Sequence, residues 1–271
     1  MDYLPHDGDE PKPPAPQPQR ARGWIGTAGA AALAFFLKFK LLLLVGVKLL
    51  APVWTFALSL WLYVALFGWR LAVVVMFVLL AHELGHYFAF RAYGLPVRLP
   101  TFVPLLGAFT AGSAAANLED DAYISLAGPI TGLGLSAACV FLAHQYDPRF
   151  WYACADVAAF LNLFNMIPTP PFDGGRIVGA VWPPLWIAGF VLFIGGGFAL
   201  HFPVFIIAIV GVLGLPSILA TLRGQADPRS ASMTLGARVR VSLWYLGTTL
   251  GLFLLMGYAH AGAAASTVRA W

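Results

Sequence analysis

Charged residues are scarce in this chain: Asp, Glu, Lys and Arg make up 10% of its 271 residues, whereas hydrophobic residues make up 60%. A soluble domain carries about 25% charged residues, so the composition excludes an ordinary soluble protein and predicts a polytopic membrane protein. The basic residues are scattered singly, which argues against a nucleic-acid partner because such binding needs a basic patch. Cysteine is rarer still. Cys139 and Cys154 lie in apolar stretches and form neither a disulfide framework nor a CxxC metal site.

Long apolar runs fill most of the remaining sequence. A helix needs about 20 apolar residues to cross the hydrocarbon of a bilayer, and we expect spans near 52–69, 71–90, 122–144, 150–168, 184–201, 203–222 and 239–259. The predicted fold is therefore all-α and polytopic, with about six to seven transmembrane helices. The stretch 23–51 places Lys38, Lys40 and Lys48 among leucines. We interpret it as a membrane-surface helix, with a first hydrophobic span as the alternative, since three lysines within one span are costly.

The basic residues predict the orientation of these spans. With a cytoplasmic N-terminus, Arg70, Arg149 and Arg269 fall outside and the other 13 of the 16 Lys and Arg residues fall inside. Such an excess of positive charge is typical of the cytoplasmic side. Residues 1–22, rich in proline and charge, are expected to form a disordered cytoplasmic tail. The sequence predicts a multi-pass protein of the bacterial cytoplasmic membrane.

One apolar span contains the polar motif HELGH. On a helix, His82 and His86 are one turn apart on the same face, so their imidazoles can bind one Zn²⁺, and Glu83 beside them can take a proton from water. The alternative is that both are satisfied core histidines. It is disfavoured because histidine is scarce, with 6 in the chain, and because a charged group at membrane depth usually marks a functional site.

Two histidines leave a catalytic zinc one protein ligand short. The candidate is Asp173, in the proline-broken segment NMIPTPPFDGG at 165–175, because irregular backbone at membrane depth is tolerated where it lines a cavity or is buried in protein. Gly174 and Gly175 would let the chain approach a metal or another backbone closely. A helix cap at the membrane rim is the alternative role for Asp173.

The pair of motifs, HELGH and NMIPTPPFDGG, resembles the site-2 protease family of intramembrane zinc metalloproteases (peptidase M50 type). AGP at 127–129 and LPTFVPLLGAFT at 99–110 add to this resemblance. It implies that His82, His86 and Asp173 bind one Zn²⁺, that Glu83 is the general base and that Asn165 is a catalytic residue near the zinc. Asn162, one turn earlier, is expected to make only an interhelical hydrogen bond. The 91–121 connection is too short for an inserted PDZ domain, so a compact member without PDZ or CBS domains is expected.

The resemblance also implies a domain organisation and a function. Residues 52–222 would form the intramembrane metalloprotease core, and 223–271 a C-terminal loop with the last transmembrane helix. The enzyme would hydrolyse peptide bonds in or near transmembrane segments of membrane-tethered substrates, within the lipid bilayer. A polytopic transporter and an inactive zinc-binding scaffold are the alternatives. The substrate and the oligomeric state stay open.

The connection between the second and third predicted spans contains an irregular segment. Residues 97–117 are too interrupted by proline and glycine to form a full span. We expect a short re-entrant or β-like segment whose strand edge binds an unwound substrate. A surface loop over the second span is the alternative.

Overall fold

A computed structural model describes residues 23–104, 107–199, 201–225, 227, 229–230 and 233–268. The predicted tail 1–22 lies outside these residues. The chain divides into two units, residues 1–50 and 51–271. In the first unit, residues 23–50 are helical and belong to α1 (Gly23–Phe67), which continues into the second unit. Within α1, only the stretch Leu50–Phe67 is long and apolar enough to qualify as a candidate membrane span.

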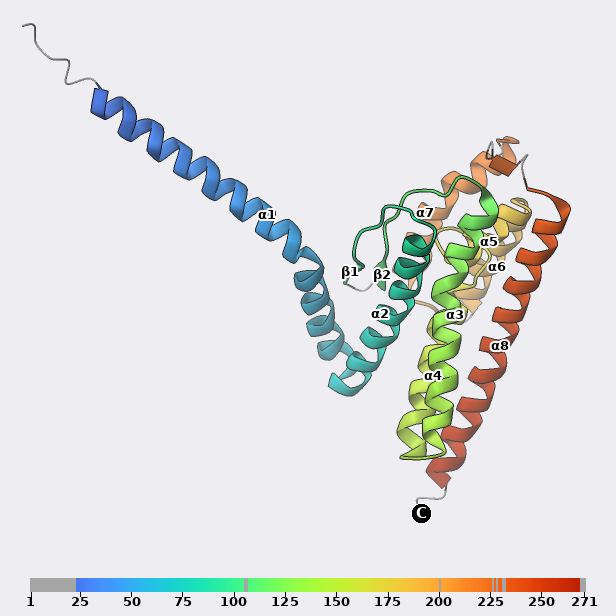
Figure 1. The fold of residues 1–271 in the computed structure, drawn as a ribbon. Helices are drawn as coiled ribbons and strands as arrows, with labels where there is room; N and C mark the ends of the chain where they lie inside the picture. Colours follow the sequence, from blue (N-terminus) through green and yellow to red (C-terminus); the bar gives the residue numbers. More distant parts are fainter. Residues whose placement is uncertain are drawn as a thin grey trace, which may run out of the picture. The chain divides into compact units, whose positions relative to one another are not determined.

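The second unit contains the rest of the described elements (Figure 1). After the end of α1 they are α2 (Trp69–Ala92), β1 (Thr101–Val103), β2 (Gly107–Phe109), α3 (Leu118–Ala143), α4 (Pro148–Asn165), α5 (Asp173–Val181), α6 (Leu185–Ala199), α7 (Val204–Leu222) and α8 (Leu235–Val268). Among the described residues, five helices are long and apolar enough to cross a membrane: the end of α1, α2, α3, α7 and α8.

Two predicted spans are not among these five helices. The segment predicted at 184–201 is α6, whose 15 residues make a shorter apolar helix. The segment predicted at 150–168 is α4, which ends at Asn165 and whose arginine, aspartate and two asparagines lower its hydropathy. The protein is mostly helical and membrane-integral, as predicted, but a count of six to seven spans is not established.

The helix α3 lies at the centre of the second unit and packs against α2, α4, α5 and α8. Its buried face is rich in small residues, including Ala122, Gly128, Gly132 and Ser136. Small residues let helix backbones approach closely, which is the usual way of packing helices in a bilayer. The backbone of α3 therefore comes close to the residues that its neighbours bury.

The helix α2 buries one face against this centre. Most of its buried residues lie three or four positions from another one, about one helical turn: Ala72, Met76, Val78, His82, Glu83, His86 and Phe90. The polar motif HELGH therefore lies on the same face as the apolar residues that pack α2 into the protein. An apolar helix can contain this polar motif because the side chains of His82, Glu83 and His86 are buried within the protein.

The expected β-like segment is confirmed as a two-stranded antiparallel sheet. Thr101 pairs with Phe109 and Val103 with Gly107, and an isolated bridge joins Val97 to Gly112. Phe102 is buried in a cluster with residues of α1 and α2. The hairpin therefore packs alongside α2. Its insertion into the membrane stays a prediction.

Candidate metal centre

The helix α2 directs both histidines of HELGH to one point. The side chains of His82 and His86 are buried, at 3% and 6% exposure, and their Nε2 atoms lie 3.1 Å apart. Their positions four residues apart bring the rings close together, as the helical repeat predicts. Two imidazole nitrogens thus converge within the protein.

The turn between α4 and α5 supplies the third group. The Cβ of any residue replacing Gly174 would lie 2.2 Å from the carbonyl oxygen of Met166, and that of a residue replacing Gly175 would lie 2.3 Å from the carbonyl carbon of Thr169. The two glycines therefore allow the start of α5 to lie against the turn that precedes it. The predicted close backbone approach is confirmed.

Side chains of later helices hold this turn in place. Trp186, in α6, donates a hydrogen bond from Nε1 to the carbonyl oxygen of Gly175 at 2.5 Å. Tyr245, in α8, donates its hydroxyl to the carbonyl oxygen of Met166 at 2.6 Å. The position of Asp173 at the start of α5 therefore depends on helices beyond the two motifs.

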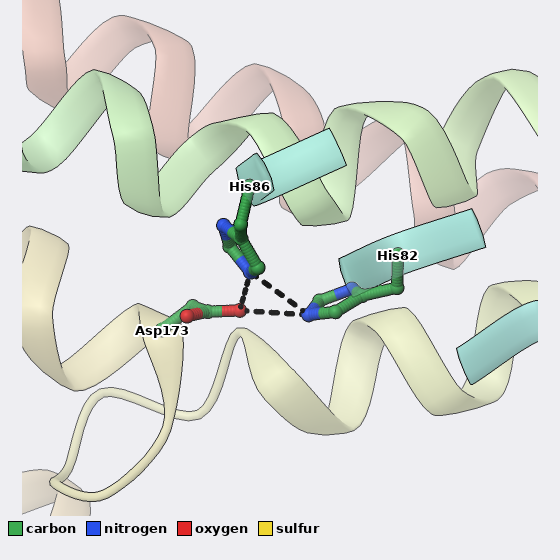
Figure 2. A group of neighbouring side chains, drawn as sticks. All are labelled: His82, His86 and Asp173. Atoms are coloured by element: carbon green, nitrogen blue, oxygen red, sulfur yellow. Dashed lines mark hydrogen bonds and ion pairs between the residues drawn. The ribbon is translucent and has the colours of Figure 1, made fainter. Parts of the chain in front are cut away.

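Asp173 points at the two histidines (Figure 2). Its Oδ2 lies 3.0 Å from Nε2 of His82 and 3.1 Å from Nε2 of His86. The capping alternative is not what the structure shows, because the N-cap of α5 is Phe172 and has no side-chain cap hydrogen bond. Residues 87 positions apart in the sequence, His86 and Asp173, are in contact.

The three atoms fit a zinc ion in number, type and spacing. Two imidazole nitrogens and a carboxylate oxygen are the protein donor set of a catalytic zinc site. A tetrahedral zinc with bonds of about 2.0–2.1 Å would hold its ligand atoms roughly 3.3 Å apart, close to the 3.0–3.1 Å seen here. His82, His86 and Asp173 form a group that could hold a metal ion.

The other ring nitrogens of the histidines have partners. Nδ1 of His82 lies 2.7 Å from Oδ1 of Asn162, and Nδ1 of His86 lies 2.8 Å from the carbonyl oxygen of Ile124. Since both partners are carbonyl oxygens, each Nδ1 carries the proton and donates it. Each Nε2 is then left with its lone pair toward Asp173, as a metal ligand requires.

Glu83 supplies a further buried carboxylate beside these ligands in the sequence. Its residue is 5% exposed, and its Oε2 has no hydrogen-bond partner among the described residues. Its backbone oxygen accepts a hydrogen bond from Thr110 at 3.1 Å, which ties the hairpin to α2. A buried carboxylate oxygen without a protein partner is suited to a water molecule or a substrate group.

The predicted role of Asn165 is not tested by the structure. Asn165 is the last residue of α4. No hydrogen bond of its side chain is found within the described part of the chain. Its assignment as a catalytic residue stays a prediction.

Sequence reasoning missed two contributions to this centre. The interhelical bond expected of Asn162 is confirmed, but its partner is His82 itself. Gly128 of the AGP motif brings α3 against the histidines: a Cβ there would lie 2.4 Å from Nε2 of His86 and 2.8 Å from Cε1 of His82. The sequence offered two weak signals for them. Asn162 is a polar residue in an apolar span, one turn before the proline-broken segment, and Gly128 is a glycine within a predicted helix.

Fold and site together define a membrane-integral protein with a buried two-histidine, one-aspartate centre. Residues 70–148, which include all of α3 and the whole HELGH motif, match the family model of Peptidase family M50. This match supports the resemblance to the site-2 protease family that the two motifs show.

Similar proteins are found among curated sequences and solved structures. Rip3 of Mycobacterium tuberculosis, described as a candidate zinc metalloprotease, is 38% identical over 132 residues, which are 44% of this chain and 33% of Rip3. Zinc metalloprotease MJ0392 of Methanocaldococcus jannaschii is 29% identical over 119 residues, 42% of this chain and 34% of MJ0392. The chain thus spans about a third of the length of these relatives. The solved site-2 protease from Methanocaldococcus jannaschii gives a TM-score of 0.42 at 20% identity, over 73% of this chain and 88% of that chain.

Proposed function

We propose that this protein is an intramembrane zinc metalloprotease that hydrolyses peptide bonds in or near transmembrane segments of membrane-tethered substrates. The observation that carries the proposal is the convergence of Nε2 of His82, Nε2 of His86 and Oδ2 of Asp173 within 3.0–3.1 Å of one another. The centre lies next to Glu83 in a protein with helices suited to a membrane. The proposal also rests on the family match and on the zinc metalloprotease relatives.

The residues of the centre would divide the work of hydrolysis. When bound, zinc supplies Lewis-acid chemistry that activates water near neutral pH and polarises a peptide carbonyl. His82, His86 and Asp173 would hold it. Glu83 would take one proton from the attacking water as the oxygen adds to the carbonyl carbon, and would pass it to the leaving amine nitrogen as the C–N bond breaks. The products are one amine and one carboxylic acid, which releases its remaining proton to the amine or to water at neutral pH.

The hairpin is the proposed docking site for the substrate. A helical segment hides its peptide groups in its own hydrogen bonds, so it must unwind before a carbonyl can reach the centre. An unwound segment can add as a strand to a sheet edge. The bond from Thr110, which follows β2, to the backbone of Glu83 links this hairpin to the proposed base.

The function is tested with purified full-length protein and a generic transmembrane segment as substrate. We expect about one zinc per chain, as a single catalytic site requires, and cleavage within or near the membrane segment. Removing the metal with a chelator should stop cleavage and returning zinc should restore it. Zinc-loaded, folded protein that fails to cleave a panel of such segments would favour the inactive scaffold.

The proposed orientation places the centre toward the cytoplasm. It rests on the distribution of Lys and Arg residues, of which 13 would lie on the cytoplasmic side and 3 on the outer side. Reporter fusions after Arg98 and Arg223 are expected to report the cytoplasm, and a fusion near Arg149 the outer side. The reverse pattern would place the centre on the opposite face of the membrane and would overturn this orientation.

Asn165 is proposed to donate a hydrogen bond to the substrate carbonyl as negative charge develops on its oxygen. A half-buried amide at the end of α4, for which the described residues offer no hydrogen-bond partner, is suited to this role. One such donor typically contributes about 10²–10³ in rate, so Asn165→Ala should retain zinc and cleave slower by about that factor. Zinc content and single-turnover cleavage rates measure the two effects. Normal cleavage by the folded variant would assign Asn165 a structural role.

A further inference from the structure

Asn162 is the side chain that links the metal-binding helix α2 to α4. Its Oδ1 lies 2.7 Å from Nδ1 of His82, although the two residues are 80 positions apart in the sequence. Both side chains are buried, at 1% and 3% exposure. A buried hydrogen bond of this kind holds a ring in one orientation, because neither group has water as an alternative partner.

The amide of Asn162 has only one orientation that satisfies its hydrogen bonds. Its Nδ2 donates to the carbonyl oxygen of Ala158 at 2.8 Å, so Oδ1 is the atom that faces the imidazole. An amide oxygen only accepts hydrogen bonds. His82 must therefore carry its proton on Nδ1, which leaves the lone pair of Nε2 for a metal.

The side-chain amide of Asn162 also packs against the backbone of α3 at Gly132. A Cβ at Gly132 would lie 1.9 Å from Cγ of Asn162 and 2.0 Å from its Nδ2. No residue larger than glycine fits there without moving the amide. Three helices thus fix one side chain: α4 carries it, α3 makes room for it, and α2 supplies the ring that it binds.

The two histidines differ in how they are held. The partner of Nδ1 of His86 is the backbone carbonyl of Ile124, which a side-chain substitution leaves in place. The partner of His82 is a side chain, so its removal leaves a buried donor without an acceptor. An outer partner of this type usually changes metal affinity by about 10–100-fold when it is lost.

We infer that Asn162 is a positioning residue of the metal centre, holding His82 in the orientation and tautomer in which Nε2 binds the metal. The inference rests on the proposed function only in so far as His82 is a metal ligand. Asn162 acts through His82 and has no contact with the substrate in this role. This role differs from those of the three proposed ligands and of the general base. It also differs from the role proposed for Asn165, which is a hydrogen bond to the substrate.

The test measures metal affinity of the full-length protein in detergent, by competition with a chelator for Zn²⁺. Asn162→Leu keeps the approximate volume and removes the acceptor, so its zinc affinity should fall by about 10–100-fold. Asn162→Asp keeps an acceptor for Nδ1–H and should restore affinity to within a few-fold of the wild type. Visible spectra of the Co²⁺-loaded proteins should change for the Leu variant and stay close to wild type for the Asp variant.

Ser136→Ala is the matched control for a purely structural effect. Ser136 is also fully buried, and its hydroxyl joins α3 to α4 through the carbonyl oxygen of Ala155 at 2.9 Å. Its loss should leave zinc affinity and the Co²⁺ spectrum unchanged. A fall in affinity for Ser136→Ala equal to that of Asn162→Leu would overturn the inference, since any disturbance of this helix pair would then suffice.

A second measurement needs no variant. In ¹⁵N-histidine NMR spectra of the zinc-loaded wild type, His82 should be coordinated through Nε2 with its proton on Nδ1. Coordination through Nδ1, or wild-type affinity in Asn162→Leu, would overturn the inference. A wild-type protein that binds no zinc at all would instead remove the proposed function, so the two failures are distinguishable.

Discussion

Replacing Glu83 with glutamine is expected to leave one zinc per chain and to slow peptide-bond hydrolysis by about 10²–10⁴-fold, the usual contribution of a general base. The amide has almost the volume of the carboxylate, and Glu83 is not among the three converging ligand groups, so metal binding should survive. Proton transfer should not, because a neutral amide cannot accept the proton of the attacking water. Metal analysis and cleavage rates on the same preparation separate the two effects.

Glu119→Gln is the matched control for this change. Glu119 lies in the first turn of α3 and pairs with Arg240 at 2.7 Å. Because Arg240 is exposed to solvent, which weakens the ion pair, loss of the pair should have little effect on stability, and the cleavage rate should stay within a few-fold of wild type. A near-normal rate for Glu83→Gln would require another residue as the base.

Removing both imidazoles is expected to abolish metal binding. The His82→Ala/His86→Ala double variant keeps only Asp173 of the three ligands, and one carboxylate is too few for a zinc site that needs three protein ligands. Zinc content should fall from about one atom per chain to near zero, with cleavage lost in parallel. Full zinc content in the purified double variant would overturn the ligand assignment.

Gly128→Ala should produce a similar loss of zinc although none of the three proposed ligand residues is replaced. The new methyl group would lie 2.4 Å from Nε2 of His86, so the ring must move or α3 must shift away from α2. Gly134→Ala is the matched control on the same helix, because a Cβ at that position meets nothing within 4 Å. Zinc loss in Gly128→Ala with normal zinc in Gly134→Ala would confirm that close approach of α3 shapes the centre.

The three converging groups could be predicted from local patterns because the chemistry of each depends on its immediate neighbours in the sequence. The four-residue spacing of His82 and His86 sets both rings on one face of a helix whatever the helix packs against. The prolines and glycines around Asp173 predict an irregular turn. Irregular backbone inside a membrane is tolerated only where it is buried in protein or lines a water-filled cavity. Scarcity of charge fixed the membrane class for the same reason: each charged group in hydrocarbon is costly.

The number of spans could not be predicted in the same way. Apolar composition shows that a segment avoids water, but it does not distinguish a full crossing from a short helix buried in the protein. The 15-residue α6 and the polar α4 have apolar stretches in the sequence and are not among the helices that qualify as spans. The hairpin at β1 and β2 was foreseen from its prolines and glycines, whereas its register was not.

The sequence by itself indicated the membrane character, the two histidines, the glutamate beside them and the carboxylate on the broken turn, because each depends on residue type and short-range spacing. Only the tertiary structure decided which helix faces meet. Helical periodicity identifies a buried face but not its partner, so the bond between His82 and Asn162 could not be read from the chain. The same holds for the room that Gly128 and Gly132 leave in α3, since close packing is a property of two surfaces together.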